Sequence, residues 1–232
     1  MIKLTHNELS EICSHLGQSK IVNIQKIFGG CINNSWRIDF KDSRFFLKKN
    51  ERNQKLLKFE KYCLNDLRKY TDSQNIIIPK VINYFVYDEN EYLLMEWLDL
   101  YNSNQKKLGI GMAEIHLNSN KKNPNKFGYS EPGFIGTSQQ MEGWEIDWVD
   151  CFIKLRIEPQ ISLLKNSSIN KNLINAIKSK IRVNLSDHEP MNSLIHGDLW
   201  SGNIGSGYQD KGIIFDPSCW WADSEIDIAM TK

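Results

Sequence analysis

The sequence predicts an α+β fold in two lobes, in which an antiparallel sheet is followed by a mainly helical region. Three observations lead to this prediction. Strand-like segments and short turns dominate residues 21–95, apolar residues at helical spacing dominate from residue 108, and a polar stretch at 102–106 separates the two regions. We therefore expect an amino-terminal lobe of residues 1–97 and a carboxy-terminal lobe of residues 98–232.

Turns and periodicity predict the elements of the amino-terminal lobe. Thr5 and Glu8 form a capping box at the start of a short helix that ends at Gly17. A second helix is expected over residues 53–70, where Glu60 lies beside a stripe of apolar side chains. We expect the strand-like segments to form a five-stranded antiparallel sheet. These segments are residues 21–28, 36–40, 44–49, 81–87 and 91–95.

The carboxy-terminal lobe is predicted to be mainly helical. Apolar spacing indicates helices over residues 108–116 and 148–155 and through Leu173 and Ile177. Trp144 is expected on the same helix as Trp148, four residues away. Residues 121–136 are rich in Asn, Pro, Gly and Lys, which is typical of a solvated loop, and residues 212–215 form an apolar strand.

Composition and charge exclude several classes of protein. A hydrophobic fraction of 41% and a charged fraction of 25% are ordinary for a globular chain. The net charge of +1 provides no basic field for nucleic acid or an anionic membrane, and the sequence KKNPNK at 121–126 is better explained as solvated loop. No segment approaches the roughly 20 apolar residues of a membrane span. We expect a small-molecule partner, and both a monomer and a homodimer remain open.

The cysteines point to a reducing compartment. There are 5 of them, scattered along the chain without a C-x-x-C pair, which argues against a disulfide framework and a zinc site. A soluble protein of the cytoplasm is therefore expected. Cys31, in a glycine-rich turn, is the one cysteine for which a redox switch is conceivable.

The strongest functional signal lies near the end of the chain. Residues 194–203 have the sequence LIHGDLWSGN, and an apolar strand then leads to Asp216. In phosphotransferases with this spacing, a carboxylate such as Asp198 accepts the proton of the attacking hydroxyl. An amide five residues later, Asn203, and the carboxylate after the next strand hold Mg²⁺, which prefers oxygen ligands. The tripeptide HGD alone would be only a turn, but the full pattern predicts an ATP-dependent phosphotransferase.

The amino-terminal lobe has the order of parts of a protein-kinase-like nucleotide lobe. A turn at Gly29 and Gly30 follows the first strand, Lys48 lies in the third, and Glu60 lies in the next helix. The turn would let backbone N–H groups approach phosphates, and Glu60 would orient Lys48 toward them. Each feature alone is weak, since hairpin turns and exposed Lys and Glu side chains are common. Their order upstream of residues 194–203 supports all of them together.

Three segments give the chain a resemblance to the fructosamine kinase (ketosamine kinase) family. They are HGDLWSGN, FDPSCWWADSEIDIAMT and IGTSQQMEGWEIDWVDCFIKLRIEPQI. The resemblance implies a fold related to aminoglycoside and choline kinases, and ATP- and Mg²⁺-dependent phosphorylation of the third-carbon hydroxyl of a sugar attached to an amine or a glycated protein. The phosphorylated product would decompose and release the amine. The implied roles are Asp198 as base, Asn203 and Asp216 as metal ligands, Lys48 and Glu60 as the phosphate-side ion pair, Glu96, Trp97 and Leu98 as the hinge that meets adenine, and Met95 as its neighbour.

Other residues near the motif have predicted roles. Trp200 is either a platform for the sugar-amine, because an aromatic face packs on sugar C–H groups, or part of the core. Trp148 and Trp220 are expected to pack in the core or a pocket wall. His196 is expected to brace the loop within residues 194–203 that carries Asp198, which we call the catalytic loop. The resemblance implies that Asp227 is a buried carboxylate that holds the backbone of this loop.

The chain ends at Lys232, directly after a segment that the resemblance continues into further helices. We therefore expect apolar surface and a partly open pocket near the catalytic loop. Two alternative functions remain: a kinase for another small alcohol, such as an aminoglycoside, choline or a homoserine-like acceptor, and a non-catalytic protein that binds nucleotide or sugar or acts as a scaffold.

Overall fold

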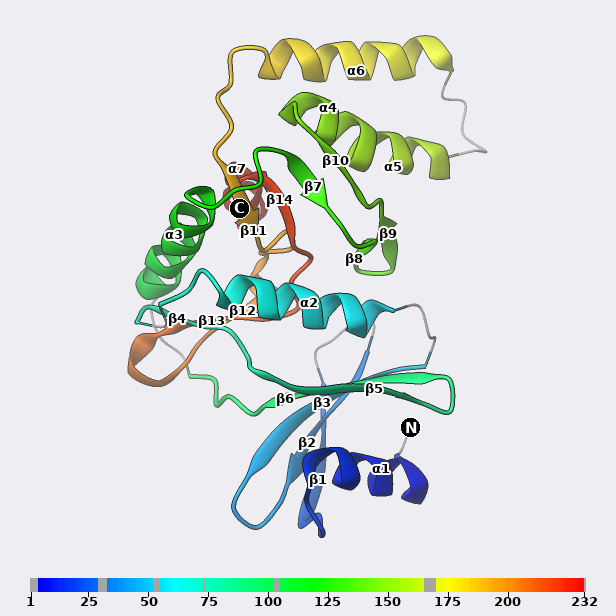
Figure 1. The fold of residues 1–232 in the computed structure, drawn as a ribbon, viewed down its shortest axis with the longest axis vertical. Coiled ribbons are helices and arrows are strands. Elements are labelled where there is room, and N and C mark those ends of the chain that lie inside the picture. The colour runs from blue at the N-terminus through cyan, green and yellow to red at the C-terminus, as the bar shows by residue number, and fades with distance from the viewer. Residues whose placement is uncertain are drawn as a thin grey trace.

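The computed structural model describes residues 4–28, 33–51, 55–72, 74–101, 105–164 and 170–231. Figure 1 shows an antiparallel sheet with α1 and α2 at one end of the molecule and the remaining helices at the other. None of the helices in these ranges is long and apolar enough to cross a membrane.

The amino-terminal sheet has the predicted five strands, all antiparallel. Its spatial order is β1-β2-β3-β6-β5, so the central strand β3 pairs with β2 and β6. The strands are β1 (Asn23–Ile27), β2 (Asn34–Asp39), β3 (Arg44–Asn50), β5 (Val81–Tyr87) and β6 (Asn90–Glu96). The predicted five-stranded sheet is therefore confirmed.

Two helices cover the two faces of this sheet. Helix α1 (His6–Leu16) begins with the predicted Thr5–Glu8 capping box. Helix α2 (Leu56–Arg68) lies between the sheet and the second lobe (Figure 1). Alternation along the strands assigns each side chain to one face. Leu47 belongs to the core cluster under α1, so the next residue, Lys48, faces α2.

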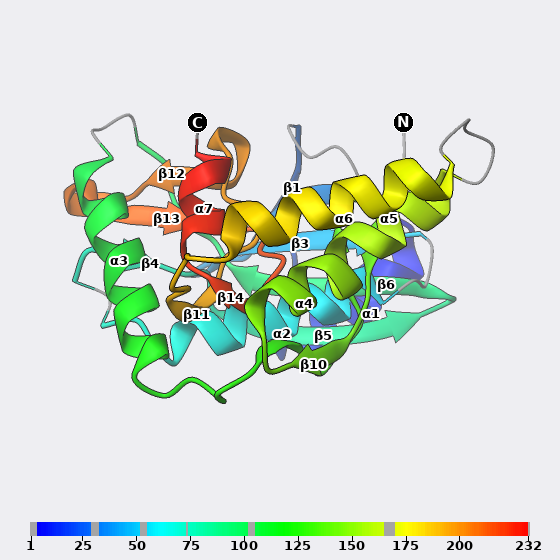
Figure 2. The same ribbon diagram turned by 90° about the horizontal axis from the view of Figure 1, so that it is seen from above.

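The second lobe is helical but differs from the prediction around Trp144. Figure 2 shows α6 lying along α4 and α5. Trp144 lies in a short strand, β10 (Gly143–Glu145), rather than on a helix, because the φ of +141° at Gly143 is incompatible with helical geometry. The helices are α3 (Lys106–Asn120), α4 (Trp148–Phe152), a π-helical turn (Ile153–Ile157), α5 (Glu158–Leu163), α6 (Lys171–Leu185) and α7 (Glu225–Met230).

Short strands organise the rest of the second lobe, and most of them carry no strong sequence signal. The predicted loop 121–136 contains β7 (Phe127–Tyr129) and β8 (Gly133–Ile135), the latter paired with β9 (Ser138–Gln140). One sheet has the order β10-β7-β14-β11, where β11 is Asn192–Ile195 and β14 is Trp220–Asp223. The other has the order β12-β13-β4 and consists of Ile204–Ser206, Gly212–Ile214 and Ile76–Ile77.

Candidate active site

The segment after β11 is held in place by a buried carboxylate. Asp227 on α7 is fully buried, and its two oxygens accept hydrogen bonds from the backbone N–H groups of His196 and Gly197, both at 2.8 Å. His116 Nε2 lies 2.9 Å from the same carboxylate. Because a buried acceptor with several donors is a rigid anchor, Asp227 fixes the path of the backbone into Asp198. The expected anchoring role of Asp227 agrees with this geometry.

The turn at Gly197 requires glycine. Its φ is +78°, and a Cβ atom at this position would lie 2.1 Å from the carbonyl oxygen of Ser218. A side chain would therefore meet backbone that cannot easily move. His196 braces the same turn, since its Nδ1 accepts from the Asp198 N–H at 3.3 Å and its Nε2 lies 3.1 Å from the Phe215 carbonyl oxygen. Burial lowers the pKa of His196 and favours the neutral ring that this bracing needs.

Asp198, Asn203 and Asp216 meet at one place. Asn203 Nδ2 donates to the backbone oxygen and to Oδ2 of Asp198, both at 2.9 Å, and lies 3.5 Å from the backbone oxygen of Asp216. Desolvation, with the nearby Asp216 charge, raises the pKa of Asp198 above that of an ordinary aspartate. A carboxylate with a raised pKa has a greater affinity for a proton, which suits a general base.

Lys48 connects the two lobes at this place. Its Nζ lies 2.7 Å from Oε1 of Glu60 on α2 and also forms an ion pair with Oδ1 of Asp216. The Lys48 side chain is buried in the sheet face that meets α2. Burial opposes its charge, but the two carboxylates outweigh burial and raise the pKa of Lys48. A permanent positive charge is therefore held beside Asp216.

Comparison with known proteins shows the family of the chain. A family model described as fructosamine kinase matches residues 3–232. The chain belongs to the fructosamine kinase family. It is thus a phosphotransferase, and the predicted resemblance is confirmed.

Similar proteins with assigned names support the assignment of the chain to this family. It is 29% identical over 229 residues to a probable ketoamine kinase of Vibrio cholerae, covering 97% of this chain and 77% of the relative. It is 31% identical over 222 residues to a probable ketoamine kinase of Escherichia coli (strain K12), covering 94% of this chain and 76% of the relative. The chain thus spans about three quarters of the length of these relatives.

Solved structures confirm the fold. A crystal structure from Haemophilus somnus 129PT, which carries the provisional name fructosamine-3-kinase, has a TM-score of 0.81 at 27% identity over 95% of this chain and 74% of that chain. Aminoglycoside phosphotransferase APH(4)-Ia, solved with AMP-PNP and hygromycin B, has a TM-score of 0.62 at 13% identity over 95% of this chain and 74% of that chain. The second likeness concerns the fold alone. The predicted kinase-like α+β architecture is confirmed.

The residues predicted as the hinge follow the sheet into the second lobe. Met95 is buried in β6 on the α2 side of the sheet. Glu96 ends that strand, and its Oε1 accepts a hydrogen bond from the backbone N–H of Lys80 at 2.7 Å. Trp97 donates through Nε1 to Asp99 at 2.8 Å, and half-buried Leu98 lies between them. Their contact with adenine stays a prediction.

The glycine-rich turn and the aromatic predictions have different outcomes. Gly29, Gly30 and Cys31 lie outside the residues that the structure describes. Trp200 is 47% exposed, so its interpretation as a core residue is wrong. Its ring lies over Gly202, where a Cβ atom would be 2.2 Å from the indole. Its role as a substrate platform stays a prediction.

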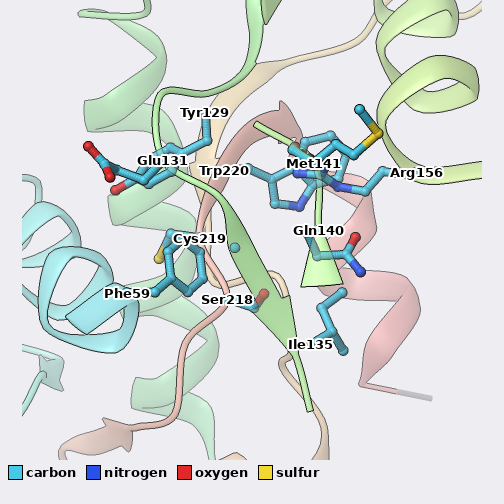
Figure 3. Close-up of a pocket in the computed structure, with 11 residues that line it drawn as sticks. Phe59, Tyr129, Glu131, Ile135, Gln140, Met141, Arg156, Ser218, Cys219 and Trp220 are labelled. Carbon is cyan, nitrogen blue, oxygen red and sulfur yellow. Dashed lines mark hydrogen bonds between the residues drawn. The ribbon is translucent and has the colours of Figure 1, made fainter. Parts of the chain in front are cut away.

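A cavity of about 310 Å³ opens beside the loop that carries Asp198. Arg156, which lines this cavity, was not among the site residues predicted from the sequence. The lining of the cavity includes Gly197 of the loop, Trp220 of β14 and Arg156 from the π-helical turn. Arg156 and Trp220 also line a second, smaller pocket (Figure 3). Buried Trp220 stacks on buried Trp148 with 5.6 Å between ring centroids, as expected for wall packing. Arg156 lies within the segment that carries the family resemblance, which is the only signal the sequence offers for it.

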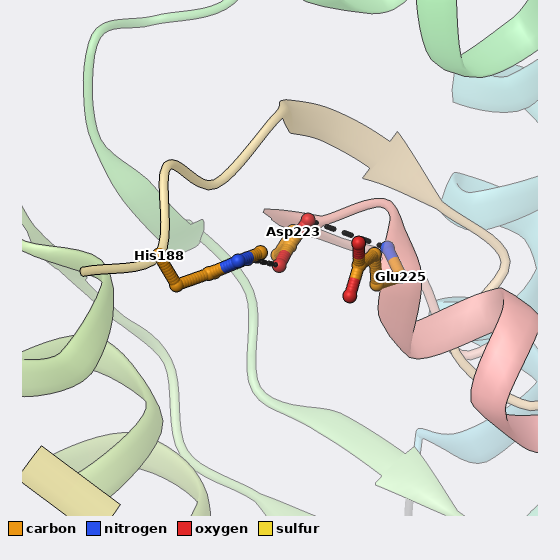
Figure 4. A group of neighbouring side chains, drawn as sticks. All are labelled: His188, Asp223 and Glu225. Carbon is orange, nitrogen blue, oxygen red and sulfur yellow. Dashed lines mark hydrogen bonds and ion pairs between the residues drawn. The ribbon is translucent and has the colours of Figure 1, made fainter. Parts of the chain in front are cut away.

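A second group of polar side chains lies at the opposite end of the β11–β14 pair from the catalytic loop. His188, Asp223 and Glu225 bring their ligand-type atoms within 4.8 Å of one another (Figure 4). His188 Nε2 pairs with Oδ2 of Asp223, and the backbone N–H of Glu225 donates to Oδ1 of the same carboxylate at 3.3 Å. These contacts join the segment after α6 to the start of α7, the helix that carries Asp227.

Proposed function

We propose that this chain transfers the terminal phosphate of ATP to a hydroxyl group of a ketosamine, a fructosyl or ribulosyl amine or the same group on a glycated protein. The observation that carries the proposal is the contact of Lys48 and Glu60 from the first lobe with Asp216 from the second, beside Asp198 and Asn203. This arrangement supports the proposal because it brings together a carboxylate that can act as a base, side-chain oxygens that can bind a metal ion, and a fixed cation. Phosphoryl transfer needs these groups and little else.

Asp198 acts as the base in this proposal. It accepts the proton of the acceptor hydroxyl while the hydroxyl oxygen bonds to the γ-phosphorus and the bond from that phosphorus to the ADP oxygen breaks. The two bonds from Asn203 Nδ2 and the anchor from Asp227 hold the loop, so the carboxylate is positioned before substrate arrives.

The residues fit a magnesium ion. Asn203 directs its Nδ2 toward Asp198, which leaves its Oδ1 without a hydrogen bond among the described residues. Asp216 adds carboxylate oxygens from the segment after β13, and Mg²⁺ prefers such oxygen ligands. When bound, the ion would neutralise charge on the phosphates. Lys48 would interact with the α- and β-phosphates, and Glu60 would keep it in that orientation.

The remaining parts of the proposal concern the nucleotide, the acceptor and the setting of the protein. Gly29 and Gly30 would cover the phosphates, and residues 95–98 would meet adenine at the junction between lobes 1–97 and 98–232. Exposed Trp200 would support the sugar. Phosphorylation would lead to release of the amine, that is, deglycation. The free thiols of Cys63, Cys151 and Cys219 fit a reducing cytoplasm.

The test is an ATP-consumption assay with a fructosyl or ribulosyl amine in the presence of Mg²⁺. Asp198→Asn should lower turnover by about 100- to 10,000-fold because it removes the general base. Nucleotide binding, measured by calorimetry, should persist in this variant. Asp42→Asn is the matched control, since Asp42 is exposed in a turn of the first lobe and its substitution should leave turnover unchanged.

Unchanged turnover in Asp198→Asn would contradict the assignment of the base. Aminoglycoside, choline and homoserine acceptors should be tested beside the ketosamines, and faster turnover of one of them would replace the proposed acceptor. Folded protein that neither binds ATP with Mg²⁺ nor transfers phosphate would favour a non-catalytic role.

A further inference from the structure

Arg156 is a partly buried cation for which the described residues provide no counterion. Its guanidinium lies over the ring of Trp220, with 3.9 Å from Cζ to the ring centroid. Its Nη1 donates to the backbone oxygens of Leu155 at 2.9 Å and Met141 at 3.2 Å. Within the described ranges no carboxylate forms an ion pair with it, whereas Arg182 nearby in the lobe pairs with Asp150 at 2.6 Å.

Several donors of Arg156 remain available. A guanidinium has five N–H donors, and Nη1 uses its two for the carbonyl oxygens. Nε is buried and has no hydrogen-bond partner among the described residues. Nη2 also forms no hydrogen bond with the described residues. Burial lowers the pKa of Arg156 to about 10, so the group stays charged at neutral pH. A buried charge and an unpaired buried donor are both unfavourable, so this arrangement calls for a partner.

The position of Arg156 indicates what that partner is. The cavity of about 310 Å³ that it lines extends to Gly197, the residue before the proposed base. The same cavity is lined by the aromatic rings of Trp220 and Phe152, and Gln160 adds an amide. An acceptor whose hydroxyl lies at Asp198 would extend over apolar rings toward a guanidinium. Perturbed charges in such a cavity are typical of ligand sites.

We propose that Arg156 binds an anionic group of the acceptor, a carboxylate or a phosphate, and thereby makes the enzyme selective for acidic ketosamines. The inference rests on the proposed function, because it assumes that the acceptor occupies this cavity. Both anions match the forked geometry of a guanidinium. A ketosamine formed on an amino acid provides the carboxylate, and a ketosamine with a phosphorylated sugar provides the phosphate.

The experiment compares matched acceptors. The acceptors are a ketosamine of an amino acid, its carboxamide, and the same carboxamide with a phosphate on the sugar. The wild-type chain should have a kcat/KM about 10- to 100-fold higher for at least one acidic acceptor than for the neutral one, as expected for a charge-assisted hydrogen bond. Preference for the carboxylate or for the phosphate identifies the source of the anion.

Arg156→Gln should abolish this preference by lowering kcat/KM for the acidic acceptor toward the value for the neutral one. Arg156→Lys keeps the charge and should retain part of the preference. Arg182→Gln is the control, since Arg182 is exposed and should leave the preference intact. Equal rates for acidic and neutral acceptors in the wild type, a preference that survives in Arg156→Gln, or an equal fall for all acceptors in that variant would each overturn the inference.

A binding measurement separates this inference from the proposed function. Calorimetric titration of the acidic ketosamine and its carboxamide needs no phosphate transfer. If no acceptor is phosphorylated but the acidic one binds wild-type protein at least tenfold more tightly than Arg156→Gln, the subsite stands and the catalytic proposal fails. If ketosamines are phosphorylated but neither rate nor binding depends on Arg156, the catalytic proposal stands and the subsite fails.

Discussion

Replacement of Asp227 by asparagine should both destabilise the protein and slow catalysis. The carboxylate is fully buried and accepts two backbone N–H groups of the catalytic loop at 2.8 Å, with His116 Nε2 at 2.9 Å. Asparagine has the same shape but only one acceptor oxygen. Its amide group must face at least one of these donors, which leaves a buried donor unpaired.

The magnitude follows from these contacts. An unsatisfied buried donor costs about 1–3 kcal/mol, and the bonds that remain lose the strengthening effect of the negative charge. The expected loss for Asp227→Asn is therefore about 2–4 kcal/mol in the free energy of unfolding. Because Gly197 and Asp198 would shift, and a misplacement of about 1 Å can cost roughly 100-fold in rate, kcat should fall by a similar factor.

Urea denaturation followed by fluorescence measures the first effect, and the ATP-consumption assay measures the second. For a slope of about 2–3 kcal/mol per molar urea, the midpoint should fall by about 1 M. Asp42→Asn, on an exposed turn, should change neither quantity. A loss below about 1 kcal/mol with full activity would show that Asp227 does not anchor the loop.

Two further predictions concern the backbone and acid stability. Gly197→Ala should prevent folding or lower the free energy of unfolding by more than about 2 kcal/mol, because the new Cβ would approach the Ser218 oxygen to 2.1 Å. A variant whose melting temperature is within about 2 °C of the wild-type value would contradict this prediction. Burial opposes the charge of Glu8, but its bond to Lys49 at 2.7 Å and further hydrogen bonds lower its pKa to about 2. The resulting stability is present above the unfolded pKa of about 4.5 and is lost as pH falls toward 2. Glu8→Gln should therefore lose about 1–2 kcal/mol at pH 7, after allowance for solvent screening, and little at pH 2; equal losses at both pH values would refute the assignment.

Local sequence patterns were sufficient to predict two contacts of the site, that of Lys48 with Glu60 and that of Asp198 with Asn203. Lys48 follows buried Leu47 in a strand, so alternation alone places it on the opposite face, where it meets Glu60. Asp198 and Asn203 are five residues apart on one loop, and their contact is set by that loop. Such relations depend on a few covalently linked residues, which is why the sequence predicts them.

Other relations depend on segments that are distant in the chain. Trp144 has helical spacing from Trp148, yet Gly143 and the pairing of β10 with β7 place it in a strand. Trp200 lies two residues after Asp198, and an aromatic side chain there is compatible with a place in the core, but the fold leaves it 47% exposed. Burial is a property of packing between segments, so periodicity alone could not decide either case.

The sequence by itself determined the family, the α+β fold and the facing of Lys48 toward Glu60, because motif spacing and strand alternation are properties of neighbouring residues. Only the tertiary structure decided that Arg156 lies on Trp220 in a cavity that reaches Gly197, without a carboxylate partner among the described residues. The charge state and availability of a side chain depend on which distant groups surround it. That surrounding exists only after the helices of the second lobe have packed against the catalytic loop.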